Sequence, residues 1–166
     1  RTEREIAGSY LATIHRQENT DDAGRLRAIL GALNSLDKAV NLLVHPRLAA
    51  KMAHFDIPQS DYDCISFLPP VPYLELVRAL SSAPGLITDS GGLQKEAFLL
   101  QVPCVTLRTE TEWLETIDLG WNVLAEPNAE LICEHLTTSP ETTTEGMPYG
   151  DGHSASRVAE TLLQKR

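Results

Sequence analysis

Residues 87–97, ITDSGGLQKEA, join an apolar run to residue types suited to binding an anion. The run ends at Asp89, and Ser90 and two glycines then open a helical pattern. The first N–H groups of a helix have no partner within it, and the helix dipole favours a negative charge there. Because Gly91 and Gly92 let a ligand approach the backbone closely, the segment predicts a phosphate site, with a diphosphate as the natural ligand.

Glu96 lies four residues after Gly92 and predicts a contact with a sugar. Side chains on a helix lean toward its N-terminus, so this carboxylate leans over a turn that carries no side chain. A carboxylate repels phosphate but accepts hydrogen bonds from a vicinal diol, and phosphate beside ribose indicates a nucleotide. The alternative is that Ser90 only caps the helix, the glycines form a tight turn, and Glu96 is a solvated surface acid.

Histidines follow two other apolar runs. His15 and Arg16 come after the run SYLATI and are candidate phosphate-binding or proton-transfer groups, because histidine titrates near neutral pH. The alternative for this pair is a surface network with Glu18. His45 follows the run NLLV and precedes a proline, so the simpler interpretation is that it only ends a strand.

Short β-type runs alternate with helical patterns along the chain, and these elements must position the polar residues. The expected strands are residues 9–15, 41–45, 64–68, 85–89, 104–107 and 122–125. The expected helices are residues 21–36, 46–55, 73–83, 91–100, 110–120, 129–138 and 154–165. This order predicts the α/β class, with a doubly wound parallel sheet covered by helices on both faces. Ligands bind such sheets beyond the carboxyl ends of the strands, so His15, His45 and residues 89–92 should lie along one edge.

Length and composition are those of an ordinary globular domain. The chain has 166 residues, of which 42% are hydrophobic and 22% charged, and no apolar run approaches the length of a membrane span. The formal net charge of −9 argues against nucleic-acid binding, because a basic surface is needed to contact phosphates. We expect a cytoplasmic protein that binds neither membrane nor nucleic acid, in which residues 1–8 are a linker remnant.

The cysteines and tryptophans are expected to have structural roles. Cys64, Cys104 and Cys133 are far apart in sequence and flanked by apolar residues, which predicts buried, reduced thiols rather than disulfides or a metal site. Trp113 and Trp121 flank an expected helix, and packing is the favoured role for both.

Several segments, in their order and spacing, resemble the C-terminal half of the non-hydrolysing UDP-N-acetylglucosamine 2-epimerases. They are LATIHRQENTDD, VHPR, ITDSGGLQKEAFLLQVPCVTLRTETEWLETIDLGWNVL and PYGDG. The resemblance runs from about Gly8 to the end of the chain. It implies one half of a two-domain enzyme of the GT-B type, a Rossmann-like α/β/α domain of about six strands. Residues 1–166 would form a single UDP-binding domain, and the N-terminal catalytic domain would be absent from this chain.

The resemblance also implies a reaction, the interconversion of UDP-GlcNAc and UDP-ManNAc. UDP is eliminated with loss of the C2 proton, and it then adds back while the proton returns on the opposite face. No cofactor and no metal is implied. The proton-transfer carboxylates of the family lie in the absent domain, so this half alone should bind UDP weakly and catalyse nothing. The intact protein is expected to be a homodimer.

Site residues can be carried over from the resemblance position by position. His15 is implied as a catalytic residue near the diphosphate, with Arg16 beside it. The implied phosphate- and ribose-binding residues are Ser90, Gly91, Gly92 and Glu96. Further candidate contacts are Tyr73, Leu76, Arg108 and Trp113. His45 is a candidate allosteric residue, because it falls near a segment that in some bacterial relatives helps to bind a second, activating UDP-GlcNAc.

Two positions depart from the family pattern. Leu76 stands where better-studied relatives have an aromatic residue near the uracil. Trp113 and Leu114 stand where many relatives have Arg-Pro, and this variant is similar to members that act on other 2-acetamido sugars, including diacetamido uronic acids. Two other classes remain open. A retaining UDP-sugar glycosyltransferase often has an acid eight residues before the ribose-binding glutamate, where this chain has Thr88, and a regulatory nucleotide-binding module would have no chemistry.

Overall fold

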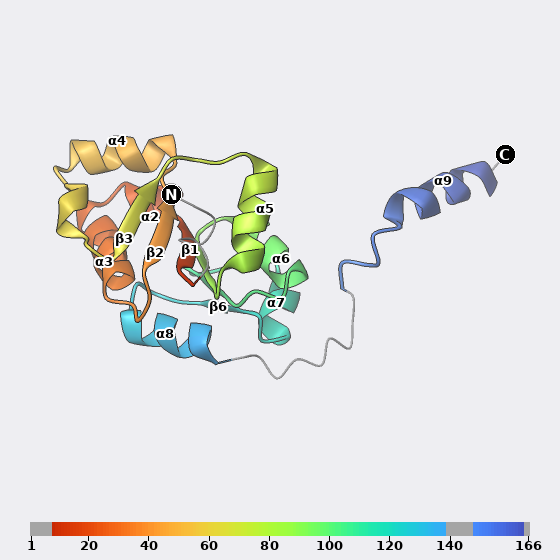
Figure 1. Cartoon of the computed structure of the whole chain (residues 1–166). Coiled ribbons are helices and arrows are strands. Elements are labelled where there is room, and N and C mark those ends of the chain that lie inside the picture. Colours follow the sequence, from red (N-terminus) through yellow and green to blue (C-terminus); the bar gives the residue numbers. More distant parts are fainter. Residues whose placement is uncertain (1–7, 139–147, 165–166) are drawn as a thin grey trace.

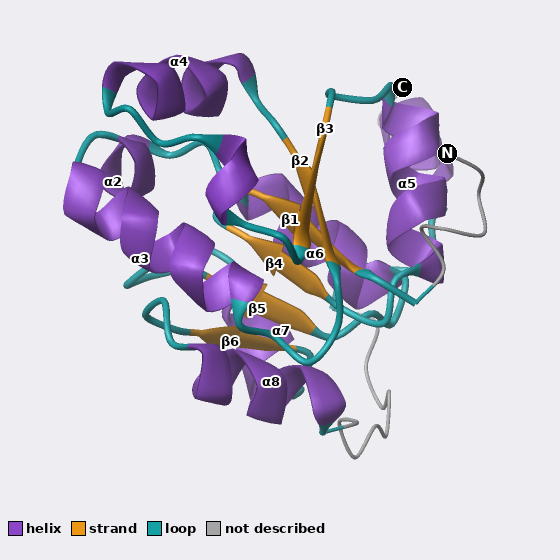
Figure 2. Ribbon diagram, turned by 60° about the vertical axis from the view of Figure 1, so that its left-hand side comes forward, coloured by secondary structure: helices purple, strands orange, loops and turns teal. Residues whose placement is uncertain are grey.

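The structure, a computed structural model, describes residues 8–138 and 148–164. Six strands form one parallel sheet in the order β3-β2-β1-β4-β5-β6 (Figures 1 and 2). The strands are β1 (Tyr10–Thr13), β2 (Val40–Leu43), β3 (Ile65–Leu68), β4 (Leu86–Thr88), β5 (Cys104–Thr106) and β6 (Asn122–Leu124). The predicted α/β class and all six predicted strands are confirmed, and the strand order reverses between β1 and β4.

Helices connect the strands in the predicted order, but the helix expected at residues 110–120 begins only at Leu114, so residues 110–113 belong to a loop. The helices are α2 (Gln17–Thr20), α3 (Ala23–Asn34), α4 (Pro46–His54), α5 (Tyr73–Ser82), α6 (Gly91–Leu99), α7 (Leu114–Asp118), α8 (Ala129–Thr137) and α9 (Ser154–Gln164), with a 3₁₀ turn at Gln59–Asp61. The four-residue helix α2 was not predicted, because a single turn leaves no periodic pattern. Asp22 and Asn128 cap α3 and α8 through their side chains, which fixes where these helices begin.

Helices cover both faces of the sheet, so the strands β2, β4 and β5 are fully buried, whereas the edge strands β3 and β6 are only partly buried. In β1 the side chains of Tyr10 and Ala12 pack into a cluster with α3, α4 and α8, whereas Leu11 packs into a cluster with α5 and α6. This follows from the alternation of side chains along a strand. Figure 2 shows α3 and α5 on opposite sides of the sheet.

Helix α9 differs from the others, because every described residue in it is exposed. It projects away from the sheet domain in Figure 1. No helix in the described ranges is long and apolar enough to cross a membrane.

The prediction of three buried thiols is wrong for Cys64, which is exposed where the chain enters β3. Apolar neighbours in the sequence did not bury it, because Cys64 directly precedes β3, which is an edge strand of the sheet. Cys104 is buried, Cys133 is partly buried, and all three are free. Trp121 is buried as expected, whereas Trp113 is only partly buried.

Candidate functional site

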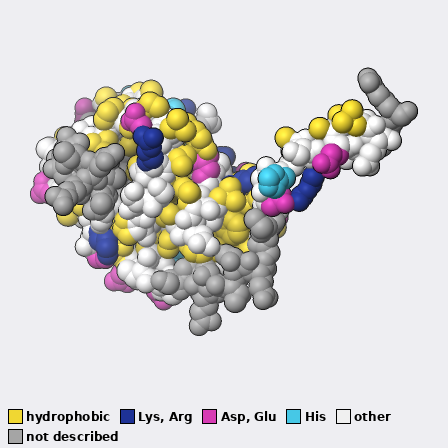
Figure 3. Space-filling model, turned by 45° about the vertical axis from the view of Figure 1, so that its right-hand side comes forward, with side chains coloured by type: hydrophobic (Ala, Val, Ile, Leu, Met, Phe, Trp, Pro, Cys, Tyr) yellow, Lys and Arg dark blue, Asp and Glu magenta, His cyan; other side chains and the backbone are white. Residues whose placement is uncertain are grey.

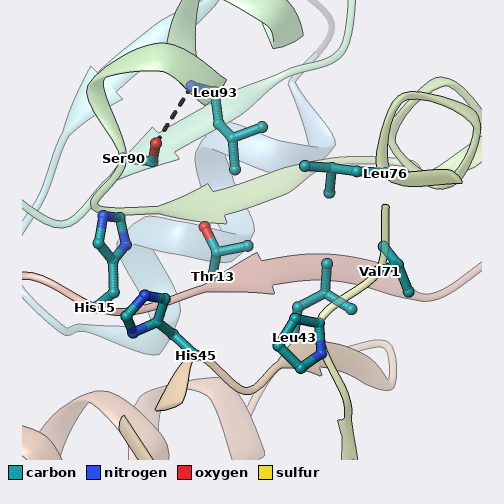
Figure 4. A pocket seen from close by; sticks show the side chains of 9 residues that line it. Thr13, His15, Leu43, His45, Val71, Leu76, Ser90 and Leu93 are labelled. Atoms are coloured by element: carbon teal, nitrogen blue, oxygen red, sulfur yellow. Dashed lines mark hydrogen bonds between the residues drawn. The ribbon is translucent and has the colours of Figure 1, made fainter. Parts of the chain in front are cut away.

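The register of the central strands brings the predicted residues to one edge. Thr13 pairs with Leu43 of β2 and with Thr88 of β4, so the three strands end at the same level. His15, His45 and Ser90 each lie two residues beyond these partners. Their side chains accordingly line one pocket at the carboxyl edge, at the point where the strand order reverses (Figure 4).

The pocket has a volume of about 250 Å³ and combines polar and apolar walls. The polar lining residues are Thr13, His15, His45 and Ser90. The apolar lining residues are Leu43, Pro70, Val71, Leu76 and Leu93. Leu76, the first departure from the family pattern, therefore lies on the apolar wall, where it offers a surface for packing and no ring for stacking.

Asp89 holds His15 in place, a contact that was not predicted although the sequence placed Asp89 at the same edge of the sheet. Its Oδ1 lies 2.9 Å from Nδ1 of His15, and the carboxylate also accepts the main-chain N–H groups of His15 and Arg16 and the side-chain amide of Asn19. Burial raises the pKa of Asp89, but the hydrogen bonds outweigh burial and lower the pKa below its ordinary value. An ionised carboxylate can only accept, so Nδ1 of His15 carries a proton.

The unpredicted helix α2 supplies the fully buried Asn19. Its amide nitrogen donates to Asp89 and to the carbonyl oxygen of Leu107, and its amide oxygen accepts from Arg25. Asp89 directly follows the buried strand β4, and an acidic residue at that place is a sequence signal that could have identified it as a site residue. Nothing in the local sequence marks Asn19 as its partner, because the contact spans 70 positions.

Ser90 caps α6, since its hydroxyl accepts the N–H of Leu93 at 3.5 Å. Among the described residues, no partner is found for the N–H groups of Gly91 and Gly92. These donors therefore point out of the first turn of a nine-residue helix, which is the arrangement that binds anions. The capping interpretation of Ser90 and the anion-binding interpretation are both compatible with this geometry.

Neither fold nor packing requires glycine at positions 91 and 92. Both residues have ordinary helical backbone angles, a Cβ at Gly91 would make only ordinary contacts of 3.5 Å or more, and a Cβ at Gly92 would meet nothing within 4 Å. Gly85 is a contrasting case, because a Cβ there would lie 2.7 Å from Cδ2 of Leu136. Glycine inside a helix costs about 0.5–1 kcal/mol relative to alanine. No contact within the described part of the chain therefore explains the glycine pair.

Glu96 is partly buried rather than fully exposed. Its Oε2 atom is buried and has no hydrogen-bond partner among the described residues. The hydroxyl of Tyr73, in the first turn of α5, lies beside it, and the Glu96 charge and hydrogen bond raise the pKa of Tyr73. A buried carboxylate oxygen without a partner is costly, so this oxygen is available to a ligand donor such as a hydroxyl group.

Arg16 lies where a phosphate at α6 would need a cation. Its Nε donates to the main-chain oxygen of Asp89, and its Nη2 lies 3.7 Å from the Cβ position of Gly91. His45 lies beside His15 with a ring-centroid distance of 5.5 Å, and its Nδ1 accepts the N–H of Arg47. His45 thus follows β2 and caps α4, which agrees with the interpretation that it only ends a strand. It also lines the pocket.

Arg108 and Trp113 are not among the residues that line the pocket. Arg108 is buried and donates two hydrogen bonds to Glu112, at 3.0 and 3.1 Å, so its charge is already paired. Trp113 packs edge-to-face on Tyr149 at a centroid distance of 5.7 Å, with the Lys95 ammonium 4.9 Å from its ring centroid. In the described part of the chain, no group of three or more His, Cys, Asp or Glu side chains is placed to hold a metal ion.

Comparisons with known proteins agree with this geometry. A family model described as UDP-N-acetylglucosamine 2-epimerase matches residues 3–163. A UDP-N-acetylglucosamine 2-epimerase homolog of Methanococcus maripaludis is 39% identical over 155 residues, which cover 92% of this chain and 43% of the relative. The UDP-2,3-diacetamido-2,3-dideoxy-D-glucuronate 2-epimerase of Pseudomonas aeruginosa is 41% identical over 162 residues, 95% of this chain and 45% of the relative.

A solved structure shares the fold closely. The UDP-GlcNAc 2-epimerase of Methanocaldococcus jannaschii, in complex with UDP-GlcNAc and UDP, aligns with a TM-score of 0.84 at 32% identity. The alignment covers 97% of this chain and 47% of that protein. The chain therefore spans about half the length of the relatives that it matches.

Proposed function

Because the chain belongs to the UDP-N-acetylglucosamine 2-epimerase family, we propose that it is the UDP-binding half of an enzyme that interconverts UDP-GlcNAc and UDP-ManNAc. The observation that carries the proposal is the open first turn of α6, whose glycines no internal contact requires, at the edge where the sheet reverses its order. The family match, and a relative solved with UDP-GlcNAc and UDP, support it.

In this proposal each group of the site contacts one part of UDP. The N–H groups of Gly91 and Gly92, with the Ser90 hydroxyl, bind the diphosphate, and the guanidinium of Arg16 adds a positive charge. The buried oxygen of Glu96 accepts a hydrogen bond from the ribose diol. The uracil packs against the apolar wall that contains Leu76.

The reaction breaks the bond between C1 of the sugar and the diphosphate oxygen, and C2 loses a proton to a base. The departing UDP gains negative charge, which the α6 dipole and Arg16 stabilise. His15, whose Nδ1 proton is directed at Asp89, turns its Nε2 to the pocket and contacts the diphosphate. The base that takes the C2 proton belongs to the half of the relatives that this chain does not span. Addition of UDP and return of the proton on the other face complete the epimerisation.

A second substrate has a specific observation in its favour. Trp113 and Leu114 depart from the Arg-Pro pair of many relatives, and one relative at 41% identity acts on a diacetamido uronic acid. A related UDP-2-acetamido sugar would use the same UDP contacts and the same chemistry at C1 and C2. A homodimeric assembly and a cytoplasmic location stay predictions of the family resemblance.

The test follows deuterium at C2. UDP-GlcNAc is incubated in D₂O with the whole enzyme, in which this chain is joined to the other half, and C2 is observed by NMR. Deuterium at C2 together with the manno epimer is the expected result. Absence of both, while this chain binds UDP, would exclude UDP-GlcNAc as the substrate and favour the diacetamido sugar or a transferase. The 166-residue chain alone should show no exchange, and measurable epimerisation by it would contradict the assignment of the base to the other half.

A further inference from the structure

The polar ends of three side chains lie close together beside Gly91, at the start of α6. A Cβ at this glycine would lie 3.5 Å from Oε2 of Glu112 and 3.9 Å from Nε1 of Trp113, with Arg16 as the third neighbour. Glu112 and Trp113 come from the loop after β5, and Arg16 comes from the loop after β1. One hydrogen-bond acceptor and two donors therefore face the same small volume beside the helix terminus.

Glu112 is held ionised at this place. Hydrogen bonds from the Arg108 guanidinium lower the pKa of Glu112 to about 2. Arg108 itself is buried, so the pair fixes the position of the carboxylate although the Glu112 side chain is 58% exposed. Arg108, on the same loop, thus favours the charged form of Glu112.

A buried polar network fixes the loop to α6. The hydroxyl of Thr111 donates to Oε1 of Gln94, a buried residue one turn after Gly91. The same oxygen accepts a hydrogen bond of 3.1 Å from Asn122 of β6, and the main-chain N–H of Trp113 donates to Thr111 at 3.1 Å. These hydrogen bonds therefore hold the loop that carries Glu112 close to the start of α6.

A fixed carboxylate next to a diphosphate is unfavourable unless a donor group lies between them. The sugar attached to the second phosphate of a UDP-sugar brings such donors, its hydroxyl groups and its acetamido N–H. We propose that Glu112 is a sugar-binding residue that accepts a hydrogen bond from a hydroxyl or amide N–H of the hexose, at the place over Gly91 that it shares with Arg16 and Trp113. This inference rests on the proposed function, and it assigns the hexose to the loop after β5.

The test compares UDP with UDP-GlcNAc on the 166-residue chain by titration calorimetry. Glu112→Gln keeps the shape of the side chain but removes its charge. We expect this variant to bind UDP at least as well as the unchanged chain, because a repulsive charge is gone, and to bind UDP-GlcNAc about tenfold more weakly, as for the loss of one hydrogen bond to a charged group. Glu110→Gln, an exposed position on the same loop, is the matched control and should leave the ratio of the two affinities unchanged.

The ratio of the affinities for UDP and UDP-GlcNAc distinguishes sugar binding by Glu112 from a purely structural role. If Glu112 only stabilised the loop, Glu112→Gln would weaken UDP and UDP-GlcNAc equally, and that result would overturn the inference while leaving the proposed function intact. If the unchanged chain did not bind UDP, the proposed function would fail, and the inference would fail with it.

A second measurement uses the unchanged chain, so it does not depend on the folding of a variant. The chain has two tryptophans, and Trp121 is buried, so the indole N–H signal of Trp113 is readily assigned in a ¹⁵N-labelled sample. The signal should move further with UDP-GlcNAc than with UDP, because Nε1 faces the same volume as Glu112. Equal shifts with the two ligands would contradict a hexose at this place.

Discussion

Gly91 and Gly92 show how a single residue type can indicate a ligand. Their backbone angles and surroundings accept a methyl group, so no contact within the described chain requires glycine here. Gly91→Ala and Gly92→Ala should therefore raise the free energy of unfolding by up to about 1 kcal/mol, the usual gain of alanine over glycine in a helix. The affinity for UDP should fall by about tenfold or more, since a methyl group hinders the close approach of the diphosphate to the main-chain N–H groups of this turn.

The control for this prediction is Gly31→Ala in α3, where a Cβ also meets nothing within 4 Å. It should raise stability by a similar amount and leave UDP affinity unchanged. Chemical denaturation and titration calorimetry measure the two quantities. Unchanged UDP affinity in both α6 variants would show that the phosphate does not lie over these glycines.

Asp89 predicts a pH dependence at the residue scale. Its pKa in the fold lies below the ordinary value of 3.8, so the unfolded chain binds a proton more readily than the folded chain. The stabilising contribution is complete above about pH 3.8, and it is lost as the pH falls from there through the lower pKa of the fold. Urea unfolding between about pH 3 and pH 7 should show this loss, and Asp89→Asn should reduce the slope in the acidic part of the range.

The same variant has a spectroscopic consequence. In the unchanged chain at neutral pH, the ¹⁵N signals of the His15 ring should report a protonated Nδ1, because Asp89 accepts from that nitrogen at 2.9 Å. In Asp89→Asn, the preference for this tautomer should weaken, since an amide can donate as well as accept. An unchanged ring spectrum in the variant would mean that Asp89 does not orient His15.

At the scale of elements, the buried network of Asn122 connects β5, β6, α6 and α7. Its amide oxygen accepts from Thr106, and its amide nitrogen donates to Gln94 and Thr116. Asn122→Leu keeps the branched shape of the side chain but leaves buried partners without hydrogen bonds, so the free energy of unfolding should fall by about 3 kcal/mol.

Asn41 of β2 is the matched control. It is also buried, yet its Nδ2 has no hydrogen-bond partner among the described residues. Asn41→Leu should change the free energy of unfolding by less than about 1 kcal/mol, or raise it, because a poorly satisfied amide is replaced by an apolar group. Urea unfolding of the two variants measures the difference, and equal losses would contradict the role given to the Asn122 network.

At the scale of the whole molecule, α9 contributes little to the stability of the sheet domain. Figure 3 shows hydrophobic side chains along one side of the projecting helix, and Val158, Leu162 and Leu163 are each at least 60% exposed. Replacing all three by serine should change the free energy of unfolding by less than about 0.5 kcal/mol, as expected for exposed positions.

The control lies in α8, which packs on the sheet. Ile132 is fully buried there, so Ile132→Ala should lower the free energy of unfolding by about 2–4 kcal/mol. Thermal or urea unfolding compares the free energies of unfolding of the triple serine variant and of Ile132→Ala. A loss in the serine variant close to that of Ile132→Ala would show that α9 packs against the domain in solution.

Much of the fold could be predicted from the sequence alone. The strict alternation of apolar runs and helical patterns determined the parallel sheet with helices on both faces, because only buried parallel strands are apolar throughout. The positions of His15, His45 and Ser90 at strand ends followed from the same pattern. The helical pattern predicted a helix at residues 21–36, and the structure forms α3 there and buries its apolar residues Leu26 and Ile29.

The tertiary structure decided which of these residues touch. Asp89 meets His15 across 74 positions, and the loop of Glu112 reaches Gly91 because strand order places β5 next to β4. Local propensity carries no information about such contacts, since they depend on the order of the strands in the sheet and on packing between distant segments. The sequence therefore determined the elements and the edge that holds the site, and only the folded chain decided which polar groups converge there.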